Sequence, residues 1–340
     1  ESDSDESVDS ETNVSVQYME MFLESDSIEK KFTIPDTIEG WADSIGVLLS
    51  SYFTEDQPFP EYAGKKVIFD FSKIRPKGSP ISNMTGKAPG PEPLRKALNH
   101  VRDVLENALQ RGLHKLRPID VFDIITHSSD AVIAGGVRRS ALLTLFSLDD
   151  QEMIRAKTGD WGITNPQRAR SNNSVLLIRN EVTQEQFAQI MESTKQFGEP
   201  GFIWADDREN LFNPCVEVGL YAHDEFGNSG CEFCNLSEIN MKGMTEDEFY
   251  IACEAGAVVG TLQAGYTDFP YLGEVTERIV KKEALIGVGM TGMMDNPKIA
   301  FNPEIQRRGA QIVVATNERI ARLIGINPSA RSTCIKPAGT

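Results

Sequence analysis

The residues most capable of chemistry lie in the stretch FNPCVEVGLYAHDEFGNSGCEFCNLSEIN, residues 212–240, which holds three of the chain's five cysteines. Asn213, Cys215 and Glu217 alternate within it, so on an extended segment their side chains would project to one face. That face would present an amide, a thiol and a carboxylate side by side. The thiol could act as a nucleophile or as a hydrogen-atom donor, and the carboxylate could take a proton from a bound hydroxyl.

The neighbouring carboxylate narrows the chemistry of this thiol. A negative charge close by opposes formation of a thiolate, which argues against a simple cysteine nucleophile and favours a thiol that stays protonated. A structural explanation also stays open, in which Cys215 is a buried cysteine on a strand and Glu217 is a surface residue.

Cys231 and Cys234 form a C-x-x-C pair, CEFC. Such a pair suits a redox dithiol or half of a zinc site. A zinc site would recruit Cys215 or His223, but those spacings fit no common zinc pattern and the sequence has no second C-x-x-C. A zinc-stabilised binding module stays an alternative for this region, although the spacing does not favour it.

Composition limits the class of protein that carries these residues. At 340 residues, with 40% hydrophobic and 25% charged residues, the chain can bury a sizeable core. The opening ESDSDESVDSE is acidic without a basic residue, and we expect residues 1–30 to be an acidic, mobile segment. The net charge of −16 argues against DNA binding. No apolar run suits a membrane span or signal peptide, which predicts a cytoplasmic protein.

Alternating strands and helices must position the chemical residues. Apolar spacing predicts a helix over residues 38–53, capped by Asp36 or Thr37, and further helices over 93–112 and 117–136. Strand-like runs alternate with helical ones later in the chain, which indicates βαβ units and a mainly parallel sheet, open or closed into a barrel. The predicted strands are 65–72, 172–179 and 198–206, residues 141–148 form an apolar run, and the later helices are 183–197, 245–263, 273–284 and 303–324.

Two of these motifs together carry a resemblance to a known family. N-P-C-x-E at 213–217, followed by C-N-L-S-E-I-N at 234–240, resembles the active-site strand and the following redox strand of the ribonucleotide reductase large subunit. The form is most similar to the adenosylcobalamin-dependent class II. The resemblance implies an α/β fold with a ten-stranded α/β barrel, incomplete at both ends here, with residues 31–340 as a partial catalytic barrel that includes effector loops.

The resemblance also implies catalytic roles. The thiol of Cys215 would become a thiyl radical that removes the 3′-hydrogen of a ribonucleotide, Glu217 would take the 3′-hydroxyl proton, and Asn213 would hold that hydroxyl. Cys234 would be one member of a redox cysteine pair, although Cys231 leaves that assignment open. Residues 1–214 contain no cysteine that could be its partner.

Two loops resemble the family's effector loops. KIRPKGSPISNMTGKAPGPEPL resembles the first specificity loop, where a deoxynucleoside triphosphate effector would bind, and AGGVRRSAL resembles the second, which links effector to substrate. Basic side chains beside glycine amides suit a triphosphate. The implied effector residues are Asp36, Thr37, Arg75, Lys77 and Gly78, and those of loop 2 are Gly135, Gly136, Arg138 and Arg139.

Two further segments resemble substrate-binding parts of the family. SNNSV matches a substrate-pocket strand, and the terminal KPAGT resembles the loop whose backbone amides hold the substrate phosphates. The implied substrate-binding residues are Ser171, Asn172, Lys336, Pro337, Ala338, Gly339 and Thr340.

The resemblance predicts reduction of ribonucleotides to deoxyribonucleotides, with adenosylcobalamin as cofactor. The expected partners are a ribonucleotide substrate, a deoxynucleoside triphosphate effector, a thioredoxin-like reductant, and N- and C-terminal parts of the same enzyme that this chain lacks. One alternative is a class I catalytic chain that receives its radical from a separate di-iron subunit. Another is a catalytically inert nucleotide-binding chain.

Overall fold

The computed structural model describes residues 28–55, 57–81, 86–134, 137–138, 140–233, 235–269 and 272–336. The chain divides into two compact units, Glu1–Asn172 with Ile190–Pro200, and Asn173–Gln189 with Gly201–Thr340. Each unit has its own hydrophobic core. Within the described ranges, every helix is too short or too polar to cross a lipid bilayer.

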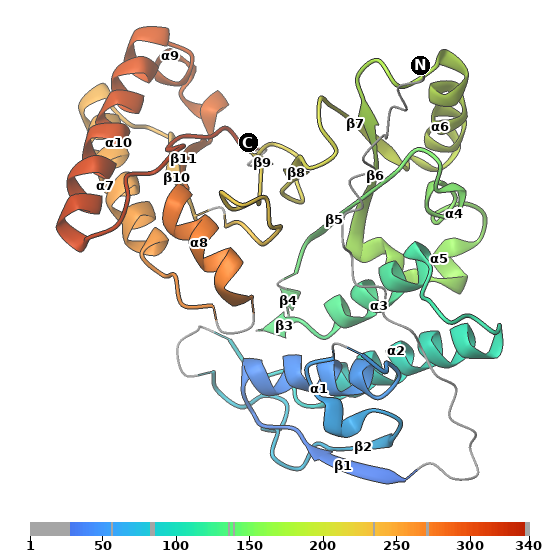
Figure 1. The fold of residues 1–340 in the computed structure, drawn as a ribbon. Coiled ribbons are helices and arrows are strands. Elements are labelled where there is room, and N and C mark those ends of the chain that lie inside the picture. The colour runs from blue at the N-terminus through green and yellow to red at the C-terminus, as the bar shows by residue number, and fades with distance from the viewer. Residues whose placement is uncertain are drawn as a thin grey trace, which may run out of the picture. The chain divides into compact units, whose positions relative to one another are not determined.

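The first unit begins with a parallel strand pair covered by a helix (Figure 1). Strand β1 (Glu29–Thr33) pairs with β2 (Lys66–Asp70), and α1 (Ile38–Ser50) connects them before a short 3-10 helix, Pro60–Tyr62. Helix α1 starts where expected because the Thr37 hydroxyl accepts a hydrogen bond from the Gly40 N–H, at 2.9 Å.

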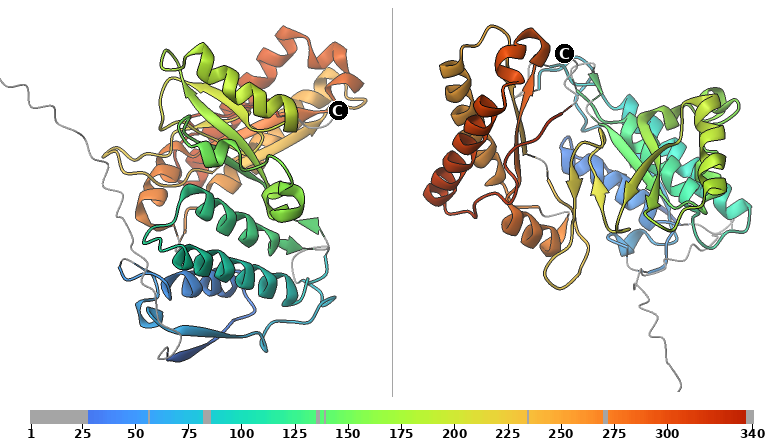
Figure 2. Two further views of the ribbon diagram at one scale, coloured as in Figure 1. Left: turned by 90° about the vertical axis from the view of Figure 1, so that its right-hand side faces the viewer. Right: turned by 90° about the horizontal axis from the view of Figure 1, so that it is seen from above.

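Helices α2 (Glu92–Gln110) and α3 (Pro118–Asp130) lie side by side in the first unit (Figures 1 and 2). One stripe of α2, with helical spacing, is completely or almost completely buried and forms the centre of the core. Each such side chain stabilises the fold by about 1.5–3 kcal/mol. The stripe consists of Leu94, Leu98, Val101 and Leu105.

Helix α3 ends earlier than its pattern predicts. It was expected to continue to Gly135–Gly136, but it stops at Asp130 and the chain enters the short strand β3 (Ile133–Ala134), which pairs antiparallel with β4 (Val137–Arg138). The β-branched residues Val132 and Ile133 favour extended backbone, which competes with the helix at this point.

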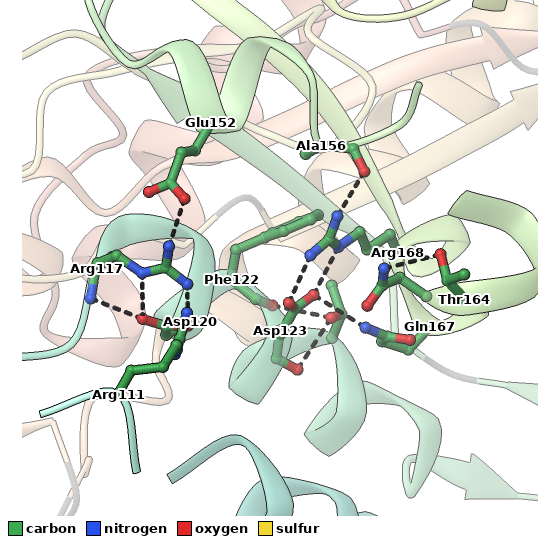
Figure 3. A network of polar contacts seen from close by, with 12 residues as sticks. Arg111, Arg117, Asp120, Phe122, Asp123, Glu152, Ala156, Thr164, Gln167 and Arg168 are labelled. Carbon is green, nitrogen blue, oxygen red and sulfur yellow. Dashed lines mark hydrogen bonds and ion pairs between the residues drawn. The ribbon is translucent and has the colours of Figure 1, made fainter. Parts of the chain in front are cut away.

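A largely buried ion pair and its hydrogen bonds tie α3 to the segment that follows it (Figure 3). Asp123 accepts hydrogen bonds from Gln167 Nε2 at 2.9 Å and from Arg168 Nη2 at 2.7 Å. Arg168 also donates to the Ala156 carbonyl, at 2.7 Å. The rest of this unit is β5 (Leu142–Phe146), α4 (Gln151–Ile154), α5 (Trp161–Thr164) and a 3-10 helix, Pro166–Arg170.

A βαβ element follows, as the alternation of patterns predicts. Strand β6 (Ser171–Ile178) leads through α6 (Gln184–Phe197) to β7 (Gly201–Ala205), and the two strands pair in parallel. Phe187 of α6 packs edge to face on Phe202 of β7, with ring centroids 5.0 Å apart. This aromatic contact fixes α6 against the strand pair.

The second unit has a parallel pair covered by two long helices. Strand β10 (Asn235–Asn240) pairs with β11 (Ile286–Thr291), and α7 (Glu246–Ala264) and α10 (Pro303–Ile324) pack beside each other next to it (Figures 1 and 2). Helix α8 (Gly273–Glu283), a 3-10 helix (Met293–Asp295) and α9 (Pro297–Ala300) complete this region.

The chain after α10 returns along β11. The Ile286 N–H donates to the Arg331 carbonyl at 3.2 Å, the Val288 N–H donates to the Ser332 carbonyl at 3.0 Å, and the Cys334 N–H donates to the Val288 carbonyl at 3.2 Å. Residues 331–334 therefore lie beside β11 in register, and they carry Lys336 to its place in the second unit.

The expected α/β class is confirmed in its coarse form, with parallel strand pairs joined by helices. The described strands form sheets of two or three strands each, and these residues do not show a ten-stranded barrel.

Candidate functional site

The N-P-C-x-E motif lies in a turn, and the expectation that it would be extended is wrong. Strands β8 (Leu211–Phe212) and β9 (Gly219–Leu220) pair antiparallel, and residues 213–218 connect them. The Val216 N–H donates to the Asn213 carbonyl at 2.9 Å, and Val216 has φ +69°. A β-branched residue at positive φ is strained, so the surrounding contacts must hold it. Alternation on a strand therefore does not position these side chains.

The turn instead brings Asn213 against Glu217. The Asn213 side chain donates from Nδ2 to Glu217 Oε1, at 2.6 Å. Its Oδ1 accepts from the Val218 N–H, at 3.0 Å. Both ends of the Asn213 amide are therefore occupied within the turn, and the amide fixes the orientation of the carboxylate.

Lys336 reaches the same carboxylate from the far end of the chain. Its Nζ lies 3.3 Å from Glu217 Oε1, and the two side chains are 21% and 10% exposed. Glu217 Oε2 is buried and has no hydrogen-bond partner. Asn213 and Lys336 thus both act on Oε1, whereas Oε2 has no partner.

The electrostatics keep this carboxylate ionised. Burial by itself would raise the pKa of Glu217, but the hydrogen bonds from Asn213, from the residue's own backbone and from Lys336 outweigh it and lower the pKa. Burial would lower the pKa of Lys336, but Glu217 outweighs it and raises that pKa, with smaller contributions from Cys215 and Glu238.

Two thiols lie in this part of the second unit. Cys215 is a free, exposed thiol in the turn. Cys334 is half-buried, and its Sγ lies where a Cβ on Gly287 would come within 2.9 Å. Burial raises the pKa of Cys334; Lys336 opposes this, and the charges of Glu217 and Glu238 add to it. The sequence interpretation did not include Cys334, because only the return of the chain along β11 places it here.

The other cysteines differ from these two. Cys231 is exposed, and its N–H donates to Thr276 Oγ1 at 3.1 Å. Cys253 is buried in the core of the second unit. The described part of the chain holds no group of three or more histidine, cysteine, aspartate or glutamate residues that could bind a metal ion.

The predicted first effector loop is organised by an ion pair in the first unit. Arg75 Nε lies 2.6 Å from Asp36 Oδ2, and Arg75 Nη1 donates to the Pro80 carbonyl at 3.3 Å. The Gly78 N–H donates to the Ala88 carbonyl at 2.9 Å, and Gly78 has φ +92°. Asp36, Arg75 and Gly78 are thus brought together. Lys77 is exposed beside them, and the Thr37 hydroxyl is used as the cap of α1.

The predicted substrate-pocket strand begins with one buried and one exposed residue. Ser171 is 3% exposed, and its hydroxyl lies 2.8 Å from that of Thr144. The buried Lys157 donates to the Ser171 carbonyl and lies 2.6 Å from Glu199 Oε2. Asn172 is exposed.

The sequence interpretation missed Asn173, which follows Asn172 on β6. It is 3% exposed, and neither atom of its side-chain amide has a hydrogen-bond partner. Buried side-chain amides are normally hydrogen-bonded, so two unpaired atoms on one buried amide are unusual. The motif SNNSV contains two neighbouring asparagines, and the sequence does not show which one is buried. In the structure Asn173 is buried and Asn172 is exposed.

Several predicted residues cannot be placed. For Arg138 only the backbone, in β4, is described. The predicted residues outside the described ranges are Cys234, Gly135, Gly136, Arg139, Pro337, Ala338, Gly339 and Thr340.

Comparison with known families gives one match in the first third of the chain. Residues 1–105 match the family model described as B12-dependent ribonucleotide reductase, insertion domain.

Curated relatives extend the similarity over most of the chain. The adenosylcobalamin-dependent ribonucleoside-triphosphate reductase of Lactobacillus delbrueckii subsp. bulgaricus is 29% identical over 99% of this chain and 49% of the relative. The probable adenosylcobalamin-dependent ribonucleoside-triphosphate reductase of Dictyostelium discoideum is 28% identical over 91% of this chain and 40% of the relative. The chain spans about half the length of the curated relatives it matches, as the 49% coverage shows.

A solved structure agrees with these relatives. The crystal structure of a B-12 dependent, class II ribonucleotide reductase superposes with a TM-score of 0.69 and 27% identity, over 93% of this chain and 47% of that one. The same family is indicated by the family model, the relatives and this solved structure. It is also the family that the N-P-C-x-E and C-N-L-S-E-I-N motifs resemble. This chain is a relative of the adenosylcobalamin-dependent, class II ribonucleotide reductases.

Proposed function

We propose that this chain supplies the central catalytic part of an enzyme that reduces ribonucleotides to deoxyribonucleotides for DNA synthesis. The observation that carries the proposal is the turn at residues 213–218. It places a free, exposed thiol, Cys215, two residues from a carboxylate, Glu217, that is buried, ionised and open at one oxygen.

The three residues of the turn have separate tasks in this reaction. Cys215 exchanges a hydrogen atom with the 3′-carbon of the ribose. Glu217 takes the proton of the 3′-hydroxyl, which requires an ionised carboxylate with a free lone pair, as Oε2 provides. Asn213, which donates to Glu217 at 2.6 Å, orients that carboxylate.

The cofactor of this proposed enzyme is adenosylcobalamin, which supplies radical chemistry by homolysis of its cobalt–carbon bond when bound. An exposed thiol that is free of any disulfide fits this chemistry, because the sulfur of Cys215 is open to a bound group. The class I alternative is not favoured, since the curated relatives described above are adenosylcobalamin-dependent.

The remaining predicted parts complete the proposal. Cys234 supplies one of the two thiols that provide the electrons, and a thioredoxin-like protein restores them. The substrate is a ribonucleoside triphosphate, as the names of the relatives support. The chain matches 49% of one relative and 47% of the solved structure. We propose that it forms part of a ten-stranded barrel, which N- and C-terminal parts of the same enzyme complete.

The effector site of the proposed enzyme lies in the first unit. A deoxynucleoside triphosphate would bind at the loop held by Asp36 and Arg75, with the exposed Lys77 and the positive-φ turn at Gly78 toward its phosphates. The second loop, with Arg138 and Arg139, would carry the effector's influence to the substrate. Ser171 and Asn172, with the terminal residues from Lys336 to Thr340, would bind the substrate.

The test is an anaerobic assay of the complete enzyme, with adenosylcobalamin, a ribonucleoside triphosphate and a dithiol. We expect deoxyribonucleotide and a cob(II)alamin signal in electron paramagnetic resonance, and both should be lost in Cys215→Ser. The control Cys231→Ser should keep the cob(II)alamin signal. A signal that persists in Cys215→Ser would remove Cys215 from the radical role. Nucleotide binding without turnover in the complete enzyme would favour the inert nucleotide-binding alternative.

A further inference from the structure

The two oxygens of the Glu217 carboxylate have unequal surroundings. Oε1 accepts from Asn213 Nδ2 at 2.6 Å and lies 3.3 Å from Lys336 Nζ. Oε2 is buried without a partner. A carboxylate that is buried to this extent normally has both oxygens hydrogen-bonded, because an unpaired buried oxygen costs about 1–3 kcal/mol. The unpaired oxygen therefore marks the direction from which a ligand would approach.

The approach of Lys336 is set by backbone structure. Residues 331–334 are held against β11 by three backbone hydrogen bonds, and Lys336 follows two residues later. Its side chain is 21% exposed, and its nitrogen reaches the carboxylate of Glu217, which is far away along the chain. A flexible surface lysine would not be expected to keep such a contact, since ordering its side chain costs entropy.

We propose that Lys336 is a positioning residue, which holds Glu217 ionised and oriented through Oε1 and thereby leaves Oε2 as the oxygen that takes the substrate hydroxyl proton. This inference rests on the proposed function. It gives Lys336 a task other than contact with the substrate phosphates, which the resemblance implies for the backbone of its loop. The proton moves from the ribose hydroxyl to Oε2, and the positive charge of Lys336 stays in place throughout.

Other charged and titratable groups face this pair and must be included in its titration. Glu238 lies on β10, and Cys334 lies on the segment beside β11, and each interacts electrostatically with Lys336. Cys215 acts on Lys336 from the turn. The carboxylate of Glu238 favours the ammonium form of Lys336, so removing Lys336 would leave Glu217 and Glu238 without their shared cation.

The experiment is a titration of Glu217 itself, which needs no turnover. The complete enzyme would be labelled with carbon-13 at the glutamate carboxyl groups, and the Glu217 signal would be assigned by its loss in Glu217→Gln. In Lys336→Met we expect the titration midpoint of Glu217 to rise by about one pH unit, since an opposite charge at this distance commonly shifts a carboxyl by one unit or more. Lys336→Arg should restore most of the shift.

Controls separate positioning from phosphate binding and from misfolding. Lys242→Met removes an exposed lysine of the same unit and should leave the Glu217 midpoint unchanged. Affinity for a ribonucleoside triphosphate, measured by equilibrium dialysis, should change by less than about threefold in Lys336→Met, below the tenfold of a 1.4 kcal/mol contact. Retention of near-ultraviolet circular dichroism would show that the variant is folded.

The outcomes are distinct from those of the proposed function. An unchanged Glu217 midpoint in folded Lys336→Met would overturn the inference, whether nucleotide affinity falls, as for a phosphate ligand, or stays the same. A raised midpoint supports it even in an enzyme that proves inactive. Absence of turnover in the unmodified complete enzyme would instead count against the proposed function, and it would leave the titration result intact.

Discussion

Each of the two units contains a carboxylate paired with a cation at a predicted site, and the two pairs differ in burial. Asp36 and Arg75 of the first unit are 29% and 39% exposed at 2.6 Å, whereas Glu217 and Lys336 of the second unit are 10% and 21% exposed at 3.3 Å. The shorter pair is the more solvated one. Water and salt screen an exposed pair, so the longer, more buried contact has the larger electrostatic effect.

The partners of each pair show a second difference. Arg75 uses a further donor on the Pro80 carbonyl, so this ion pair organises a loop. Lys336 and Asn213 both act on one oxygen of Glu217, so that pair orients the carboxylate that we propose as the proton acceptor. The distance between the two charges therefore does not separate the pairs, whereas burial and the unpaired oxygen of Glu217 do.

The largest effect is expected from Glu217→Gln. This substitution keeps the shape of the side chain and removes its ability to accept a proton, so turnover in the complete enzyme should fall by about 10²–10⁴-fold. Glu225→Gln, at an exposed position in the same unit, is the matched control and should leave turnover unchanged. If Glu217→Gln retained more than a tenth of the activity, Glu217 would not be the base. The Glu217–Lys336 pair would then have no catalytic role to distinguish it from the Asp36–Arg75 pair.

A third ion pair tests whether burial decides how much an ion pair contributes to the free energy of unfolding. Asp123 and Arg168 lie 2.7 Å apart and are 13% and 12% exposed (Figure 3). Loss of one partner leaves the other buried without compensation, so Asp123→Ala should lower the free energy of unfolding of the first unit by roughly 3 kcal/mol. Urea denaturation measures this, with Asp149→Ala at an exposed position as control. A loss below 1 kcal/mol would show that burial is a poor guide here.

The exposed pair should behave in the opposite way. Asp36→Asn should cost less than about 1 kcal/mol of unfolding free energy, because solvent already screens the pair. What remains should diminish further in 0.5 M salt, where charges interact over shorter distances. The same urea titrations at low and high salt would measure both values. A large loss of unfolding free energy that does not depend on salt would show that the Asp36–Arg75 pair behaves like a buried ion pair.

The smallest effect concerns pH. Because the pKa of Glu217 is lowered in the folded chain, its carboxylate contributes stability at pH values above the ordinary glutamate range, and this contribution is lost as the pH falls through the lowered pKa. Below pH 5 the unmodified protein should therefore lose more stability than Glu217→Gln, by less than about 1 kcal/mol. Thermal unfolding of both proteins from pH 7 to pH 3 would compare them. Parallel curves would contradict the lowered pKa.

Local signals made the helices predictable. The helix expected over 245–263 is α7, Glu246–Ala264, because Thr245 and Glu248 form a capping box within four residues of each other. The start of α1 was likewise determined by the neighbouring Thr37. The end of α3 was missed, since there the extended preference of Val132 and Ile133 competes with a helical apolar pattern.

The site was only partly predictable. Sequence identified Asn213, Cys215, Glu217 and Lys336 as site residues, but it placed the first three on a strand. A turn with Val216 at φ +69° has no strong signature in a sequence without glycine at that position. The contact of Lys336 with Glu217 and the burial of Asn173 both depend on tertiary packing, which no local pattern encodes. The roles of these residues, and the barrel that would enclose them, stay predictions.

Gly287 of β11 shows how a residue without a side chain can control this site. A Cβ there would lie 2.5 Å from Leu236 Cδ2 and 2.9 Å from Cys334 Sγ. A single added methyl group would therefore have to displace the side chains of Leu236 and Cys334, the second of which lies on the segment that leads to Lys336. Any substitution at Gly287, a position with no chemistry of its own, would therefore disturb the packing beside the segment that leads to Lys336.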